Sequence, residues 1–252
     1  MKWMNHLIVA LALFIVATLL ADIVISVPNQ QYLNSCRENF QAVQDLCGTY
    51  ARAHDRRFPD GKSSNEALRQ IFVAGSMTDE KFFSDSDYSS SRADGNLGTQ
   101  ANGFVQALAP GECFMTYVRG LTRDQKDPDP PLFFGQVVGF DGEIYTLCAR
   151  VHERVSRHST EDGAVLEEHE GKTVDIFSEA YLKEKYGIEP QDILKPEGPP
   201  RDLTAIAKAR KRYLHAIQAG ILALIWLPFP LTVWIKHRRN AKTPPEKPVL
   251  EV

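Results

Sequence analysis

Two long apolar segments, one near each end of the chain, limit what this sequence can fold into. The first runs from Leu7 to Val27 and holds 21 residues with one charged side chain, Asp22. The second runs from Tyr213 to Ile235 and holds 23 residues without Asp, Glu, Lys or Arg. About 20 apolar residues suffice for a helix to cross the hydrocarbon core of a bilayer. The sequence therefore predicts two transmembrane helices.

A cleaved signal peptide is the alternative for the first segment. Cleavage would follow Ala21, but Leu19 stands where a small residue is preferred. We therefore favour a retained anchor, and both alternatives export the residues that follow. Asp22 lies near the outer end of the segment, so we expect it at the water interface rather than as a functional acid within the membrane.

The basic residues around these segments predict the orientation. Lys2 precedes the first segment and Asp22 lies at its far end, which favours a cytoplasmic N-terminus. Four basic residues flank the second segment on each side, so the first segment decides. The predicted organisation is a cytoplasmic N-terminus (1–6), a transmembrane helix (7–27), an extracytoplasmic domain (28–207), a basic flank with a second transmembrane helix (208–235) and a cytoplasmic basic tail (236–252).

The domain between the two segments is acidic. Residues 28–207 contain 29 Asp and Glu residues against 19 Lys and Arg residues. A negative surface repels the phosphate backbone, so nucleic-acid binding is not expected. A domain of 180 residues is long enough to bury its own core.

The domain begins with a predicted helix from about Asn29 to His54. Apolar residues recur there at intervals of three and four, which places them on one helix face. Pro28 lies between this helix and the membrane segment, and proline kinks or breaks a helix. We therefore expect a long, kinked helix that rises from the bilayer. The members of the apolar stripe are Leu33, Cys36, Phe40, Val43, Cys47 and Tyr50.

The sequence of the rest of the domain predicts short helices and an antiparallel sheet. It also predicts a loop at 84–102 and a linker at 195–201. Strands are expected at 113–118, 132–140 and 143–151, with a two-residue hairpin turn at Asp141-Gly142. A second Asp-Gly turn at 162–163 precedes two further strand-like runs. Helices are expected at 65–75 after Ser63 or Ser64, at 79–83 after Thr78, at 178–187 with Ser178 as N-cap and Gly187 as stop, and after Asp202. Since strands and helices do not alternate, the predicted fold class is α+β.

Four cysteines are candidates for disulfides outside the membrane. Cys36 and Cys47 share a helix face but lie about 16 Å apart along it, too far for a bond between them. Any bond should therefore join one of them to Cys113 or Cys148, or join Cys113 to Cys148. The alternative is that the helix cysteines are simply apolar residues of the stripe.

The sequence contains no catalytic signature, so we do not expect an enzyme. A Cys113–His152–Asp site can be imagined, but no local motif supports it. His54, His158 and His169 are scattered, and no Cys-x-x-Cys pair indicates zinc. Glycine-rich nucleotide motifs do not occur either. We therefore assign no catalytic, cofactor-binding or metal-binding residue, and no small-molecule ligand.

The run from Cys36 to Gly61, CRENFQAVQDLCGTYARAHDRRFPDG, resembles the stalk of type II secretion pseudopilin-like proteins of planctomycete and verrucomicrobial bacteria. Similar segments follow at 77–83, 107–118 and 161–177, so the resemblance covers 31–200 in patches. The chain differs from that pattern in lacking a Gly-Phe prepilin processing site and in having a second apolar segment. The matching positions of the first run are Cys36, Asn39, Phe40, Tyr50, Ala51, His54, Asp55, Phe58 and Pro59.

The resemblance implies a pilin-like fold, in which a long N-terminal helix packs on an antiparallel sheet. It also implies a bacterial inner-membrane protein with a periplasmic domain. The expected function is a structural or interaction role, with the lipid bilayer and secretion-system or envelope proteins as partners. The alternative is an envelope sensor that acts through a cytoplasmic partner.

Overall fold

The computed structural model describes residues 2–75, 77–83, 93–160, 164–169 and 172–226. The chain divides into two compact units. One unit is Pro28–Arg210, and the other comprises Met1–Val27 with Lys211–Val252. The predicted domain, 28–207, differs from the first unit by three residues at its end.

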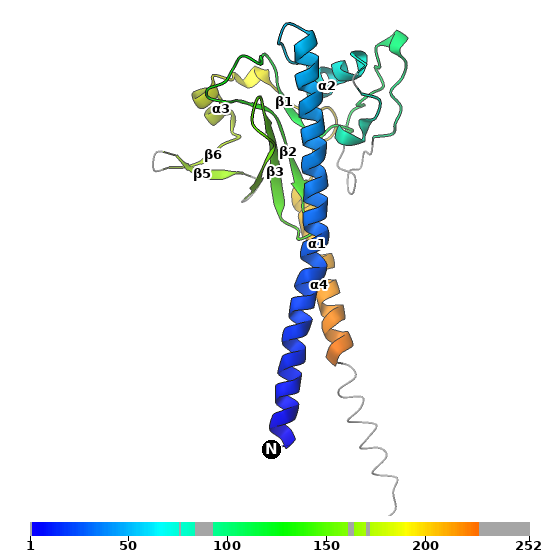
Figure 1. The fold of residues 1–252 in the computed structure, drawn as a ribbon, viewed down its shortest axis with the longest axis vertical. Coiled ribbons are helices and arrows are strands. Elements are labelled where there is room, and N and C mark those ends of the chain that lie inside the picture. Colours follow the sequence, from blue (N-terminus) through cyan, green and yellow to red (C-terminus); the bar gives the residue numbers. More distant parts are fainter. Residues whose placement is uncertain (1, 76, 84–92, 161–163, 170–171, 227–252) are drawn as a thin grey trace, which may run out of the picture. The chain divides into compact units, whose positions relative to one another are not determined.

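Four α-helices, three short 3-10 helices and seven strands make up the described part of the chain (Figure 1). The helices are α1 (Lys2–Ala53), α2 (Ser64–Val73), α3 (Glu179–Tyr186) and α4 (Leu203–Trp226), with η1 (Glu80–Phe83), η2 (Gln100–Asn102) and η3 (Pro190–Asp192). The strands are β1 (Thr116–Val118), β2 (Pro131–Val138), β3 (Ile144–Arg150), β4 (Ser156–Ser159), β5 (Leu166–His169), β6 (Lys172–Asp175) and β7 (Ile193–Leu194).

The Pro28–Arg210 unit has an α+β architecture, as predicted. Its main sheet is antiparallel throughout, in the order β4-β3-β2-β1-β7. Strands β5 and β6 form a separate two-stranded hairpin. The predicted strands at 113–118, 132–140 and 143–151 correspond to β1, β2 and β3. The second Asp-Gly turn, at 162–163, lies outside the described residues.

Helix α1 presents its predicted apolar stripe to the sheet. Phe40 and Cys47 are fully buried, and Leu33 is nearly so, whereas Tyr50 at the end of the stripe is only half-buried. The Phe40 ring centroid lies 5.4 Å from that of Phe133 on β2. Of the two predicted effects of Pro28, a kink or a break, the break does not occur, because α1 continues through this residue as one long helix. Proline lacks one backbone donor, but the helix tolerates that loss here.

The predicted N-cap residues of α2, α3 and α4 act as caps, although α2 ends at Val73 rather than at the predicted Gly75. Ser63 caps α2 by accepting a hydrogen bond from the Glu66 N–H at 3.1 Å. Ser178 caps α3 through the Tyr181 N–H, and Gly187 ends that helix with φ at 69°. Asp202 accepts from the Ala205 N–H at 2.8 Å at the start of α4. Each cap satisfies an amide that the first turn of a helix leaves without a partner.

The β2–β3 hairpin forms at Asp141-Gly142, but its turn is longer than the two residues predicted. Val138 and Ile144 are the last paired residues, and the Gly139 N–H donates to the Glu143 carbonyl at 2.8 Å. Gly142 has φ at 77°, which suits a three-residue connection ending in a left-handed residue.

The edge of β2 that faces β1 is completed by side chains. Strand β1 pairs only with Phe133 and Phe134, so the later residues of β2 need other partners on that edge. Arg201 donates to the Gln136 carbonyl at 3.4 Å, and Arg210 donates to the Val138 carbonyl. Two arginines therefore occupy an edge that another strand could otherwise extend.

The hairpin tip joins the two helices at the boundaries of this unit. Asn29 of α1 donates to Asp141 Oδ2 at 2.6 Å and accepts from the Phe140 N–H at 2.7 Å. The Arg210 guanidinium of α4 lies 5.2 Å from the Tyr32 ring centroid and 5.0 Å from that of Phe140. Both boundaries of the unit, Pro28 and Arg210, therefore lie at the same end of it. We call the residues Asn29, Tyr32, Phe140, Asp141 and Arg210 the hairpin clamp.

Gly139 leaves no room for a side chain beside the hairpin clamp. An added Cβ would lie 2.7 Å from Asn29 Oδ1 and 2.8 Å from Tyr145 Cε2, and would also meet Asp141. We expect Gly139→Ala to lower the free energy of unfolding by about 1–2 kcal/mol through overpacking. Urea unfolding of the full chain measures this loss.

Gly48→Ala is the matched control. Gly48 lies within α1, and a Cβ added there would have nothing within 4 Å, so this substitution should be neutral or stabilise by up to about 1 kcal/mol. Equal effects of the two substitutions would contradict the close packing around Gly139.

Within the part of the chain that the structure describes, no helix combines the length and the apolar character that crossing a membrane requires. Residues 227–252 lie outside this part, so the second predicted span, Tyr213–Ile235, is described only as far as Trp226.

Candidate functional site

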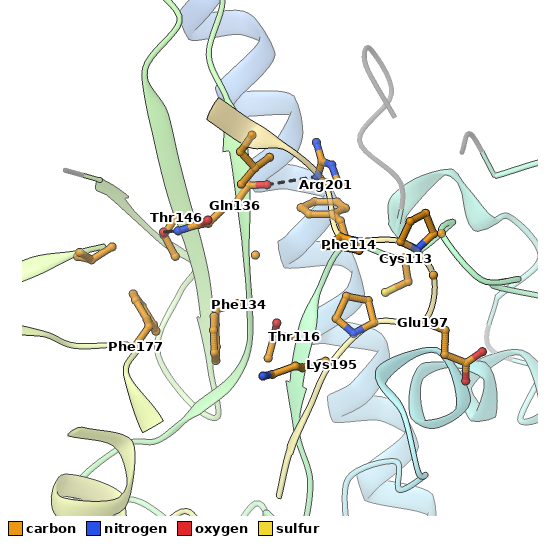
Figure 2. A pocket seen from close by; sticks show the side chains of 18 of the residues that line it. Cys113, Phe114, Thr116, Phe134, Gln136, Thr146, Phe177, Lys195, Glu197 and Arg201 are labelled. Carbon is orange, nitrogen blue, oxygen red and sulfur yellow. Dashed lines mark hydrogen bonds between the residues drawn. The ribbon is translucent and has the colours of Figure 1, made fainter. Parts of the chain in front are cut away.

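A pocket of about 540 Å³ opens on the face of the sheet opposite α1 (Figure 2). Thr116, Phe134, Cys148 and Ser156 are partners across β1, β2, β3 and β4, so their side chains share that face. Leu194 of β7 pairs with Tyr117, which places the following residue, Lys195, beside Thr116. Lys195, Thr116 and Phe134 thus form a row along the floor of the pocket.

A second row lies two residues further along β2 and β3. Gln136 pairs with Thr146, which in turn pairs with His158 of β4. Gln136 Nε2 lies 3.4 Å from Thr146 Oγ1, within hydrogen-bond reach, and Thr146 is 1% exposed. Along the strands, the floor therefore changes from the row with Phe134 and Lys195 to a row with the amide of Gln136 and the hydroxyl of Thr146.

One wall of the pocket is aromatic. Phe177, which follows β6, packs on Phe134 with ring centroids 4.9 Å apart and planes 30° apart. The ring centroid of His158 lies 5.8 Å from that of Phe177. Burial lowers the pKa of His158, while the Glu167 carboxylate 3.8 Å away opposes this effect. Burial thus favours the uncharged form of this ring beside the aromatic wall.

The opposite wall is the segment 195–201, which was predicted as a linker. The structure corrects this prediction, because several backbone bonds attach the segment to the domain. The Gly111 N–H donates to the Glu197 carbonyl at 2.7 Å, and the Glu197 N–H donates to Asn65 Oδ1 at 2.8 Å. The Ser64 N–H also donates to the Lys195 carbonyl at 3.2 Å. Proline content suggested a solvated connector, but these bonds make the segment part of the folded domain.

The charged groups around the pocket differ in exposure and in hydrogen bonding. Figure 2 shows the Glu197 carboxylate directed away from Phe134 and Thr116, and it accepts a hydrogen bond from Ser63. Asp175 Oδ1 accepts from the backbone N–H groups of Val165 and Phe177 at 3.2 and 3.1 Å. Lys195 remains the most exposed charge of the site, with its side chain 76% exposed.

The four predicted disulfide candidates, Cys36, Cys47, Cys113 and Cys148, are all buried thiols in the structure. This arrangement corresponds to the alternative in which cysteines serve as apolar core residues. Burial raises the pKa of Cys113 to about 11 and that of Cys148 to about 12, and it also raises the pKa of Cys47. Thiols of this kind are poor nucleophiles, because the thiolate is the reactive form.

Thiol labelling tests this arrangement. At pH 8 the folded protein should react very slowly with a maleimide, because the cysteines are buried and the raised pKa values keep the thiols protonated. Unfolding in denaturant without reductant should expose all four to labelling, as intact mass will show. Only two labels after unfolding would contradict the thiol state and indicate a disulfide.

Cys113 and His152, the residues of the imagined hydrolase site, have separate surroundings. Cys113 Sγ lies 3.8 Å from Ser64 Oγ and 3.8 Å from the Met115 carbonyl. The His152 ring nitrogen Nε2 lies 2.8 Å from the Gln125 carbonyl, and its backbone N–H donates to Asp129. These contacts give the two side chains structural roles.

Three carboxylates gather away from the pocket, with ligand atoms within 4.8 Å of one another: Glu80, Asp94 and Glu112. Backbone N–H groups donate hydrogen bonds to two of these carboxylates, Glu80 and Glu112. Glu80 accepts from the Leu108 N–H at 2.7 Å and from the Gly95 N–H at 3.2 Å. Glu112 accepts from Ala109 and Asp94 at 2.6 and 2.9 Å. The cluster therefore fastens the segment 94–112 to the domain.

Comparison of the chain with known protein families, with curated proteins and with solved structures gave no match. The pocket residues Lys195, Thr116 and Phe134 were not anticipated from the sequence, where they belong to three separate segments. The only available signal was the alternation of β1 and β2, which places Thr116 and Phe134 on one sheet face.

Proposed function

We propose that this chain is a membrane-anchored, pilin-like interaction protein of the bacterial inner membrane, whose Pro28–Arg210 domain lies on the periplasmic side. The observation that carries the proposal is the hairpin clamp. It places the Arg210 guanidinium of α4 5.2 Å from the Tyr32 ring centroid of α1, so the two ends of the domain lie close together. A domain between two membrane helices requires this arrangement when both helices enter one bilayer surface.

The chemistry of the domain supports an interaction role. Burial raises the pKa values of the Cys113 and Cys148 thiols, and it lowers the pKa of His158. The pocket on the sheet instead combines aromatic, hydroxyl and amide groups with charged side chains, of which Lys195 is the most exposed. Such a mixture suits recognition of a ligand. The packing of the long helix α1 on an antiparallel sheet supports the pilin-like part of the proposal.

Cysteine accessibility in intact cells tests the topology. Glu184 is exposed on α3, so Glu184→Cys should react with a membrane-impermeant maleimide before lysis if the domain is periplasmic. Asn240→Cys, in the predicted cytoplasmic tail, should react only after lysis. The unmodified chain is the control, because its own cysteines are buried.

The reverse labelling pattern would contradict the proposed orientation. Labelling of both positions before lysis would contradict a two-span topology, and labelling of neither would indicate a cytoplasmic domain.

A further inference from the structure

We propose that the pocket on the sheet binds the carboxyl terminus of a partner polypeptide that ends in an aromatic or large aliphatic residue. This inference rests on the proposed interaction role and names the chemistry of the partner. Its evidence is the order of groups along the pocket, from Lys195 and Thr116 through Phe134 and Phe177 to Gln136 and Thr146.

Lys195 and Thr116 can receive a terminal carboxylate. They lie next to each other at one end of the floor, where an ammonium and a hydroxyl offer a charged and a neutral donor (Figure 2). Lys195 pairs with the Glu179 carboxylate at 3.8 Å, and both side chains are more than half exposed. An exposed pair of this kind contributes little, so a ligand carboxylate can replace it.

Phe134 and Phe177 can receive the terminal side chain. Phe134 follows Thr116 in the floor row, and Phe177 stands against it at 4.9 Å. Val165 extends the same apolar surface. Since a flat apolar group buries its faces well against tilted rings, an aromatic or large aliphatic side chain fits here.

Gln136 and Thr146 can receive the second peptide group before the terminal carboxylate. They lie two residues along β2 and β3 from the first row, a step of roughly 6–7 Å in a strand. An extended peptide advances by the same amount over two residues. The Gln136 amide is both donor and acceptor, so it can match the N–H and C=O of a peptide bond.

The remaining groups around the pocket are compatible with a negative end group. Glu197 is directed away to Ser63, and Asp175 Oδ1 is engaged by two backbone amides. Pro196, Pro199 and Pro200 of the opposite wall have no backbone N–H. Arg201 is a second cation of the pocket, at the Gln136 end, where its guanidinium donates to the Gln136 carbonyl at 3.4 Å and lies 5.4 Å from the Phe114 ring centroid. Lys195 is the more exposed of the two cations, so we place the carboxylate at the lysine end.

Fluorescence anisotropy of labelled peptides on the purified full chain tests the proposal. The probe is fluorescein-labelled Gly-Ser-Leu-Phe with a free carboxyl terminus, and the matched probe is the same peptide ending in an amide. The unmodified protein should bind the acid about tenfold more tightly than the amide, because only the acid makes a charge-assisted hydrogen bond. Empty micelles or nanodiscs give the background.

Lys195→Met is the decisive variant, because it keeps the apolar stem and removes the charge. On this variant the acid and the amide should bind equally, both at the affinity of the amide for the unmodified protein. Lys183→Met is the matched control, since Lys183 also forms an exposed pair, with Glu189 at 2.8 Å, away from the pocket. It should preserve the tenfold preference.

Three outcomes would overturn the proposal: no saturable binding of the acid peptide, equal binding of acid and amide to the unmodified protein, or an unchanged preference in Lys195→Met. Equal affinity for free 3-phenylpropionate and for the acid peptide would overturn the assignment to a polypeptide, because Gln136 and Thr146 would then contribute nothing. All these results concern the pocket alone, so the topology proposed above is tested separately by the labelling in cells.

Discussion

Replacing Phe40 by alanine is expected to lower the free energy of unfolding by about 3–5 kcal/mol, the usual cost of truncating a fully buried aromatic residue. Phe40 lies at the centre of the contact between α1 and the sheet. Its ring is 5.6 Å from that of Phe114 and 5.4 Å from that of Phe133. Alanine would leave a cavity between α1 and these two rings. Urea unfolding of the full chain, followed by circular dichroism, measures the loss.

Glu38→Ala is the control on the exposed face of the same helix, and it should change stability by less than about 0.5 kcal/mol. The loss in free energy of unfolding for Phe40→Leu should lie between those of Phe40→Ala and Glu38→Ala, because leucine fills part of the space that alanine leaves empty. A loss below about 1 kcal/mol in Phe40→Ala would show that α1 does not depend on this contact.

Replacing Glu80 by alanine is expected to lower the free energy of unfolding by about 2–3 kcal/mol, since a buried amide loses its acceptor. Glu80 is completely buried and accepts from the Leu108 N–H at 2.7 Å. The Leu108 amide is buried inside the domain. Gly95, the other residue that donates to Glu80, is exposed to water. Thermal and urea unfolding measure the effect, and Glu184→Ala on the exposed face of α3 is the control.

The effect of Glu80→Ala should also depend on pH. Burial raises the pKa of Glu80, and the nearby Glu112 and Asp94 carboxylates raise it further, against the backbone donors. A carboxyl group with a raised pKa in the folded state contributes more to stability below its unfolded pKa, and loses part of that contribution as pH rises through the folded value. The difference between the unmodified protein and the variant should therefore be larger near pH 4 than at pH 7. A difference that grows with pH would contradict the raised pKa.

Local sequence signals predicted the helices and the central hairpin. Ser63, Ser178 and Asp202 act as N-caps in the structure, because a cap needs only its own helix to form. The apolar spacing of α1 predicted its buried face for the same reason. The hairpin at Asp141-Gly142 was located correctly, although its turn length was not.

Features that depend on distant parts of the chain could not be predicted. Strand β7 has only two residues, Ile193 and Leu194, and exists because β1 provides an edge for it. Strand β4, with the sequence SRHS, has no apolar alternation, yet it pairs with β3. Lys195 reaches the pocket through β7, so the site could not be anticipated without the pairing of these strands.

The hairpin clamp also determines how a mechanical load would enter the domain. Both chain exits are fastened to one hairpin tip through Asn29 and Arg210, so a force pulling the helices apart acts first on these few contacts. The paired residues of β2 and β3 lie behind the tip and are joined by a ladder of backbone pairs. The tip would therefore release before the sheet, and the two exits could separate while the domain stays folded.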